Sequence, residues 1–145
     1  MRGFAAVGLD NPKTPSNIAG VLRACGCYGV SLCAITGKRY QRHGADTKKQ
    51  WREMPLLHVE DLHTVIPYDC VPIAVELSPF AQSIVDFVHP RRAFYIFGAE
   101  DNTLGERILS WCHDVIMIPT VSCMNLAACV NVVLYDRMQK QLREV

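Results

Sequence analysis

The chain has 145 residues, with 15 basic and 14 acidic side chains and a hydrophobic fraction of 50%. This size and composition predict one globular domain over residues 1–145, and they exclude a chain that is disordered through low complexity. Because the formal net charge is +1, any affinity for nucleic acid must come from a local basic patch.

Short apolar runs alternate with longer amphipathic stretches along the chain. The runs predict strands at residues 4–9, 30–35, 56–59, 72–77, 93–97 and 115–118. The amphipathic stretches predict helices at residues 15–26, 60–66, 80–87, 104–112 and 125–143, with the poorest pattern over 80–87. The alternation of the two element types favours an α/β fold.

The predicted strands are apolar throughout, a pattern typical of strands that are buried on both faces. We therefore expect a mostly parallel six-stranded sheet with helices on both faces. Ligands of such sheets bind at the carboxyl ends of the strands. The segments of interest are those that follow strands, at residues 11–17, 36–51, 78–81, 98–105 and 119–125.

The first of these segments leads into a helix that carries Asn17 and Arg23. A helix advances about 100° per residue, so the two side chains converge only if Asn17 sits at the helix entrance. In one interpretation Asn17 is a first-turn capping residue and Arg23 is a solvated charge. In the other, Arg23 has an anionic partner, because apolar residues flank it on both sides.

Two later segments carry further polar candidates. Gly98 and Glu100 follow the apolar strand at 93–97, where glycine permits close approach of a ligand to the backbone. Ser122 and Asn125 precede the last helix, and both residue types cap helices well. A plain turn for the first segment and a capped helix for the second are the open alternatives, and Asn125 could equally turn its amide to a ligand.

A basic loop follows the second predicted strand. Its basic residues are Lys38, Arg39, Arg42, Lys48, Lys49 and Arg52, and Tyr40, His43 and Trp51 lie among them. Cations interleaved with aromatic rings suit phosphate contacts and base stacking in RNA. A solvated charged loop is the open alternative.

Other classes of site lack support in the sequence. No G-x-G-x-x-G segment, Walker loop or nucleophile elbow is present. The seven cysteines include no C-x-x-C pair, so we expect reduced thiols and no metal site. No apolar stretch reaches the ~18 residues of a membrane span, and the first residues lack the signal-peptide pattern. We therefore expect a cytoplasmic protein with no membrane partner.

Three segments, taken together and in this order, resemble the SpoU/TrmH branch of the SPOUT superfamily of RNA methyltransferases. They are NPKTPSNIAGVLRACGCYGV at residues 11–30, FGAEDNTLG at 97–105 and IPTVSCMNLAACVNVVLYD at 118–136. The third is most similar to small tRNA ribose methyltransferases that consist of the catalytic domain alone. The resemblance implies a C-terminal trefoil knot that binds S-adenosylmethionine, and a homodimer with each active site near the subunit interface.

The resemblance also implies roles for particular residues. The motif positions for catalysis are Asn17, Arg23, Glu100 and Asn125, and those for the cofactor are Leu77, Gly98, Ile118, Cys123 and Met124. Leu77 matches by position alone, and its neighbour Glu76 could equally fill that place. The sequence departs from the family at Ala19, where glycine is usual, and at Cys123, where serine is usual and would donate a better hydrogen bond.

The implied reaction is methyl transfer to a ribose 2′-oxygen of RNA, with Arg39, Arg42, Lys48, Lys49 and Arg52 as RNA contacts. A catalytic domain without a separate RNA-binding domain favours a small target such as a tRNA loop. Four alternatives stay open: a non-catalytic RNA-binding relative, an rRNA methyltransferase, base methylation, and an unrelated flavodoxin-like module that binds a phosphorylated small molecule.

Overall fold

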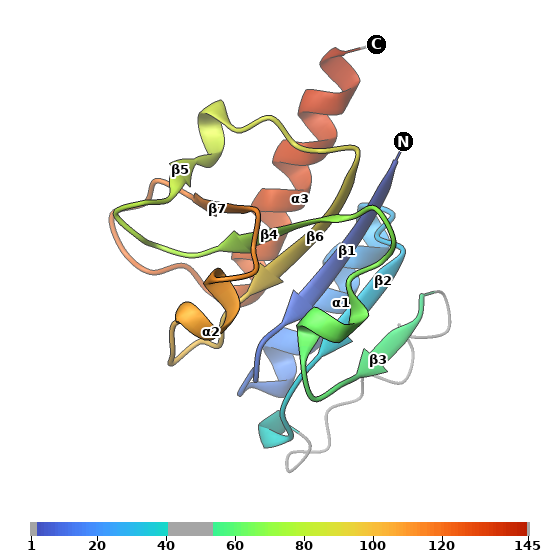
Figure 1. The fold of residues 1–145 in the computed structure, drawn as a ribbon, viewed down its shortest axis with the longest axis vertical. Coiled ribbons are helices and arrows are strands. Elements are labelled where there is room, and N and C mark those ends of the chain that lie inside the picture. The colour runs from blue at the N-terminus through green and yellow to red at the C-terminus, as the bar shows by residue number, and fades with distance from the viewer. Residues whose placement is uncertain (1–2, 41–53, 145) are drawn as a thin grey trace.

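The computed structural model describes residues 3–40 and 54–144. Within these residues seven parallel strands form one sheet in the order β3-β2-β1-β6-β4-β7-β5 (Figure 1). The strands are β1 (Phe4–Leu9), β2 (Leu32–Ile35), β3 (Leu56–His58), β4 (Val71–Val75), β5 (Gln82–Ser83), β6 (Arg92–Phe97) and β7 (Asp114–Met117). The helices are α1 (Pro15–Cys27), η2 (Leu62–Val65), η3 (Ile84–Asp86), α2 (Glu106–Leu109) and α3 (Leu126–Arg143).

The six predicted strands are all present, with ends within two residues of the predicted ones. The prediction of six strands is wrong by one, because β5 lies inside the segment 80–87 that was predicted to be helical. Gln82 and Ser83 pair with Ile116 and Met117 at the open edge of β7. The weak helical pattern of this segment yields to hydrogen bonds that a distant strand supplies.

The other differences concern helices. The helix predicted at 60–66 is a single 3-10 turn, η2, and the helix predicted at 104–112 shortens to the four residues of α2. Gly105 precedes α2 with a φ of 70°, a left-handed conformation that favours glycine and that no α-helix contains. The helix therefore begins only after Gly105, and residue 104, which was predicted to be helical, lies outside it.

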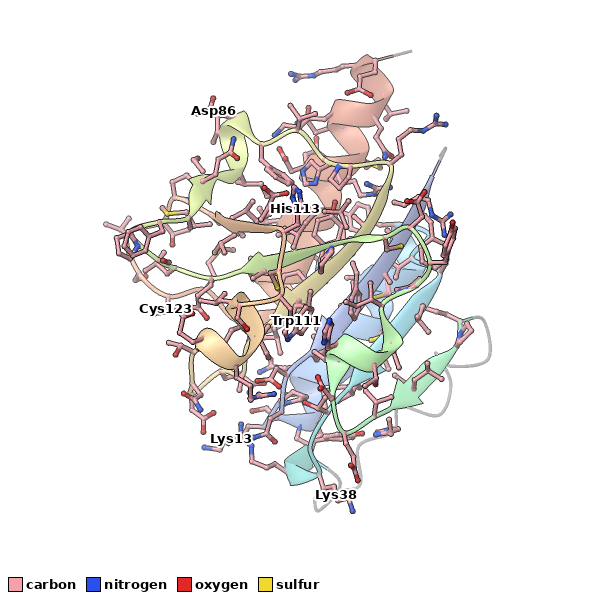
Figure 2. All side chains as sticks on the ribbon, in the orientation of Figure 1. Lys13, Lys38, Asp86, Trp111, His113 and Cys123 are labelled. Carbon is pink, nitrogen blue, oxygen red and sulfur yellow. The ribbon has the colours of Figure 1, made fainter. Side chains whose placement is uncertain are left out.

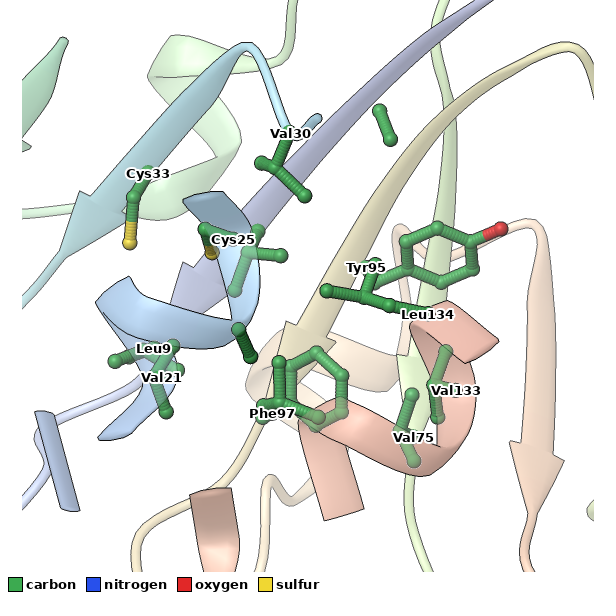
Figure 3. Packing of buried hydrophobic residues seen from close by; sticks show 14 of the residues in the cluster. Leu9, Val21, Cys25, Val30, Cys33, Val75, Tyr95, Phe97, Val133 and Leu134 are labelled. Carbon is green, nitrogen blue, oxygen red and sulfur yellow. The ribbon is translucent and has the colours of Figure 1, made fainter. Parts of the chain in front are cut away.

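Helices cover both faces of the sheet, as predicted. Alternate residues of β1 divide between two cores: Val7 and Leu9 pack with α1 and α3, whereas Ala6 packs on the face of η2 and α2. Figure 3 shows part of the first core, in which Leu9 and Phe97 from the sheet lie near the helix side chains. Both faces of the central strands are thus buried, which explains their lack of polar alternation.

Helices α1 and α3 approach each other closely at Gly20. A Cβ atom at this position would lie 2.8 Å from the Cβ of Ala127, closer than such atoms come in proteins. The absence of a side chain at Gly20 therefore sets the spacing of the two helices. This contact brings the first turns of both helices, and with them Asn17 and Asn125, to the same end of the sheet.

The connection between β5 and β6 is held against the C-terminal half of α3. The buried Arg137 donates from its guanidinium to the carbonyl oxygens of Pro90 (2.7 Å) and Arg91 (2.9 Å). Lys140 Nζ donates to the carbonyl oxygens of Ile84 (2.6 Å) and Phe87 (2.9 Å). Figure 1 shows this connection crossing α3, and these four hydrogen bonds join it to the helix.

A buried histidine, His89, also joins the connection between β5 and β6 to α3; we call these contacts of His89, Arg137 and Lys140 the α3 clasp. The ring nitrogens of His89 lie 2.7 Å from the Tyr95 hydroxyl and 2.8 Å from the Asp136 carboxylate. Burial lowers the pKa of His89 despite the opposing effect of Asp136, so the imidazole is neutral at pH 7.

No helix in the described ranges has the length and apolar character needed to cross a membrane.

The hydrogen bonds of the α3 clasp predict that the protein loses much of its stability when the Arg137 guanidinium is removed. We expect Arg137→Met to lower the free energy of unfolding by about 3 kcal/mol, because two carbonyl oxygens lose charged donors inside the fold. Urea denaturation measures the change. The exposed Arg143→Met is the control, and an equal effect of the two substitutions would contradict this account.

Candidate active site

Three side chains, one from each motif, form a continuous hydrogen-bonded chain. Asn17 Nδ2 donates to Glu100 Oε1 over 2.9 Å, and Asn125 Nδ2 donates to Asn17 Oδ1 over 2.8 Å. These residues come from α1, the loop after β6 and the residue before α3. The structure therefore joins segments that are 83 and 108 residues apart in the sequence.

Glu100 also serves the start of α1. Its carboxylate accepts hydrogen bonds from the backbone N–H groups of Lys13 (2.9 Å) and Thr14 (3.4 Å). Thr14 stands at the N-cap position of α1 but makes no side-chain capping bond. The carboxylate of Glu100 thus supplies negative charge and acceptors to a helix end that lacks its own cap.

These contacts determine the ionisation of Glu100. Partial burial acts to raise the pKa of Glu100. The hydrogen bonds from the Asn17 amide and from backbone N–H groups, including those of Lys13 and Thr14, outweigh burial and hold the pKa below its ordinary value. The group is a carboxylate at neutral pH.

Asn125 combines the two roles that the sequence left open. Its Oδ1 accepts a hydrogen bond from the backbone N–H of Ala128 (3.2 Å), so it caps α3. Its Nδ2 points the other way, to Asn17. Asn17 itself lies inside the first turn of α1 and makes no cap, so the capping interpretation holds for Asn125 and is wrong for Asn17.

A cavity of about 370 Å³ lies at the carboxyl ends of β4, β6 and β7. Its lining residues are 75–77, 97–103, 117, 118, 120, 123, 124, 126 and 129. All five predicted cofactor positions, Leu77, Gly98, Ile118, Cys123 and Met124, are among them, as is Glu100. Their contact with a cofactor stays a prediction, but the structure brings them to one hollow at the sheet edge.

Backbone packing shapes this cavity at Gly98. A Cβ atom here would lie 3.3 Å from the carbonyl oxygen of Asn102, which is tighter than most such contacts. The loop after β6 therefore folds back on itself at a place where a side chain would be crowded.

In the described part of the chain, no group of three His, Cys, Asp or Glu residues could hold a metal ion.

Two cysteines line the cavity, Cys123 in the loop before α3 and Cys129 in α3 itself. Cys123 is exposed on the loop before α3 (Figure 2), where a ligand in the cavity could reach it. Cys129 lies deeper, and burial, aided by the charge of Glu76, raises its pKa to about 11. Cys129 is therefore a neutral thiol that packs as a small apolar group.

Arg23 lies apart from the cavity. It is exposed on α1 and lines no part of the hollow, whereas its neighbours Leu22 and Ala24 are buried. Among the residues with described positions, no acidic side chain pairs with Arg23. The expectation that its apolar neighbours imply an anionic partner is not met within this part of the chain.

The predicted RNA contacts fall into two groups. Arg42, Lys48, Lys49 and Arg52 lie outside the described residues. Arg39 is described, and its guanidinium binds the Asp101 carboxylate (2.9 and 3.0 Å) and the carbonyl oxygen of Asn11 (2.6 Å).

The Arg39–Asp101 pair links the basic loop to the cavity wall. The hydrogen bond between the two groups raises the pKa of Arg39 and lowers that of Asp101. Sequence reasoning missed this tie, because 62 residues separate the partners and neither belongs to a recognisable pair. Lys13 and Lys38 project at the same end of the sheet (Figure 2), so cationic groups border the site.

The sequence model of the SpoU rRNA Methylase family matches residues 5–135. A search of the curated proteins finds no match.

Solved structures share the fold at low sequence identity. SpoU methyltransferase AviRb from Streptomyces viridochromogenes, in complex with the cofactor AdoMet, has a TM-score of 0.83 and 18% identity, over 98% of this chain and 59% of that one. The A. aeolicus TrmH/SpoU tRNA modifying enzyme has a TM-score of 0.82 and 17% identity, over 97% and 76%. A structure that addresses 2-OH methylation of C/U34 on tRNA has a TM-score of 0.80 and 19% identity, over 98% and 93%. The chain spans less than two thirds of the AviRb chain.

The lowered pKa of Glu100 predicts a loss of stability in acid. A carboxyl whose pKa is lower in the folded state than its unfolded value of ~4.3 stabilises the fold above that pH, and this contribution is lost as the pH falls through the folded value. We expect Glu100→Gln to weaken the decline in unfolding free energy between about pH 5 and pH 3. Urea denaturation at several pH values measures it.

The exposed Glu60→Gln is the control for this prediction. It should leave the acid decline close to that of the unaltered protein. If Glu100→Gln and the unaltered protein lose stability with the same pH dependence, the carboxylate does not hold the site together as described.

Proposed function

The chain belongs to the SpoU rRNA Methylase family, and we propose that it is an S-adenosylmethionine-dependent RNA methyltransferase that modifies ribose 2′-oxygens, with tRNA as the favoured substrate. The observation that carries the proposal is the hydrogen-bonded chain of Asn17, Glu100 and Asn125, which joins the three motif segments next to a cavity that residues of the second and third segments line.

Family membership confirms the resemblance based on the three motifs. The likeness to SpoU methyltransferase structures confirms the predicted fold class, a parallel α/β sheet with the C-terminal knot of the SPOUT superfamily. In this chain the connection between β5 and β6 crosses α3 and is hydrogen-bonded to it through Arg137 and Lys140. General folding rules would have disfavoured the knot, since knots are rare.

The cavity is suited to the cofactor in size and chemistry. Its volume of about 370 Å³ lies in the range of small-molecule sites, roughly 300–1,000 Å³. Leu77, Ile118 and Met124 give apolar walls, and the loop at Gly98 offers backbone groups. When bound, S-adenosylmethionine supplies an activated methyl group on a sulfonium. Cys123 would face it where the family usually has serine.

The chain's own residues would align and activate the RNA. In the reaction the ribose 2′-oxygen would bond to the methyl carbon, the carbon–sulfur bond would break with its electron pair on sulfur, and the hydroxyl proton would pass to water. Arg23 would bind the phosphate next to the reacting ribose and help that proton to leave. A guanidinium keeps its positive charge in water, so phosphate binding suits Arg23 better than a role as a free base.

The hydrogen-bonded chain would fix the element that carries Arg23. Glu100 holds the first turn of α1 at its N-terminal end, and Asn125 holds it through Asn17. Arg23 stands two turns further along the same helix. A rigid α1 therefore converts hydrogen bonds at one end of the helix into a defined position for the guanidinium.

We further propose that the active unit is a homodimer. Arg23 is exposed and lines no part of the cavity of its own chain, so a second subunit would be needed to bring guanidinium and cavity together. Exposed apolar side chains support such a contact. Val121 precedes α3, and Tyr135 and Leu142 lie on its outer surface.

Charge near the cavity supports an RNA substrate. Lys13, Lys38 and Arg39 lie at the same end of the sheet, and the predicted contacts Arg42, Lys48, Lys49 and Arg52 belong to the adjoining segment. The favoured tRNA target draws support from the fold shared with the protein of the C/U34 study, over 93% of its chain. Seven free thiols suit the reducing cytoplasm, where we place the reaction.

Replacement of Arg23 tests the mechanism. We expect Arg23→Ala to lower methyl transfer to RNA by about 100-fold or more, because the phosphate clamp and the aid to proton loss both disappear. Affinity for S-adenosylmethionine, measured by calorimetry, should stay unchanged, since Arg23 lines no part of the cavity.

The matched control is Arg143→Ala, an exposed arginine near the end of α3. It should leave the rate near normal. Near-normal transfer by a folded Arg23→Ala protein would remove Arg23 from the mechanism. Digestion of the modified RNA identifies the methylated nucleoside, and a base-methylated product would contradict the ribose proposal.

A further inference from the structure

We propose that Glu76 makes the cavity selective for the positively charged methyl donor over its neutral thioether product. The inference rests on the proposed function, because it concerns the ligand of the same cavity. The resemblance offers Glu76 only as an alternative to Leu77 for one place in the cofactor loop, and it gives the carboxylate no role. We assign a role in ligand specificity to the side chain that follows β4.

The sheet fixes the backbone of Glu76 beside the cavity. Glu76 directly follows the last residue of β4, and its N–H donates to the carbonyl oxygen of Ile116 in β7 over 3.0 Å. The residue is half-buried and lines the cavity. Its position is therefore set by strand pairing and does not depend on a long loop.

The carboxylate of Glu76 is held by neutral donors. Its Oε1 accepts from the backbone N–H of Leu77 (3.1 Å), and its Oε2 accepts from that of Leu104 (2.8 Å). Within residues 3–40 and 54–144, no lysine, arginine or histidine forms an ion pair with it. Each oxygen keeps acceptor capacity, because a carboxylate oxygen has more than one lone pair.

The two other acids of the cavity wall are already engaged. Asp101 pairs with the guanidinium of Arg39. Glu100 binds the Asn17 amide and the N-terminal end of α1. Among the three acids of the described lining, Glu76 is thus the one whose negative charge is balanced neither by a cation nor by the N-terminal end of a helix.

The lining itself supplies no positive charge. Three acids and no lysine, arginine or histidine occur among the lining residues that the structure describes. The field of Glu76 also reaches Cys129 in the lining, where it adds to the effect of burial in raising the pKa of Cys129. A cation in the cavity would therefore be attracted, with less screening than in bulk water.

Methyl transfer changes the ligand by one charge. The donor carries a sulfonium, an ammonium and a carboxylate, and the product differs in having a neutral thioether at sulfur. An unneutralised carboxylate strengthens binding of the donor relative to the product. Such a cavity holds its substrate and releases its product, which favours turnover.

Two other roles for Glu76 predict different behaviour. Glu76 could accept a hydrogen bond from a ribose hydroxyl of the ligand, or it could merely tie the loop after β6 to β4 through Leu104. The donor and the product share the same ribose and would depend equally on the same loop. Loss of Glu76 would then weaken the two ligands alike.

Calorimetric affinities for S-adenosylmethionine and S-adenosylhomocysteine separate these roles. We expect the unaltered protein to bind the donor more tightly than the product. Glu76→Gln should reduce donor affinity about tenfold more than product affinity, a difference of about 1.4 kcal/mol. Glu76→Asp, which keeps the charge, should preserve the preference even if both affinities fall.

Glu106→Gln is the control, because Glu106 is exposed at the start of α2 and lies outside the cavity lining. It should leave both affinities unchanged. Equal weakening of the two ligands by Glu76→Gln, or a product that binds the unaltered protein as tightly as the donor, would overturn the inference. The second measurement needs no variant, so it decides the matter even if Glu76→Gln fails to fold. An unaltered protein that binds neither ligand would instead contradict the proposed function.

Discussion

The carboxylate of Glu100 is the constraint on which the geometry of the site depends. It accepts hydrogen bonds from the start of α1 and from Asn17, and Asn17 in turn accepts one from Asn125. One ionised group thus orders the loop after β6, the first turn of α1 and the entry into α3. Because its donors include backbone N–H groups at a helix end, the negative charge is stabilised where it stands.

This arrangement needs a rigid support, which packing between helices and strands supplies. The close approach at Gly20 sets α1 against α3, and the Arg137 and Lys140 contacts hold the connection between β5 and β6 around α3. Loops at the ends of parallel strands can then carry function without moving relative to one another. The cavity forms between these loops because the strands beneath them are fixed by their register.

Charge is distributed unevenly around the cavity. Outside it, Lys13 and Lys38 offer positive charge to a polyanion. Within its wall Glu76 offers negative charge to a cationic small molecule, while Asp101 is neutralised by Arg39. An RNA and a sulfonium donor carry opposite charges, so this separation suits an enzyme that must bind both at adjoining places. The exposed position of Arg23 fits the same scheme if a second subunit completes the site.

The sequence by itself determined the elements whose signal is local. Apolar runs located six strands, the helical period located α1 and α3, and the ordered motifs indicated the family and the residues that line the cavity. Tertiary structure alone decided the pairing of β5 with β7, the bond of Arg39 to Asp101 and the contact of Glu76 with Leu104. Each of these joins residues at least 28 positions apart. Periodicity and propensity describe a side chain's neighbours within a turn or a strand, whereas these partners meet only after the sheet has brought distant loops to one edge.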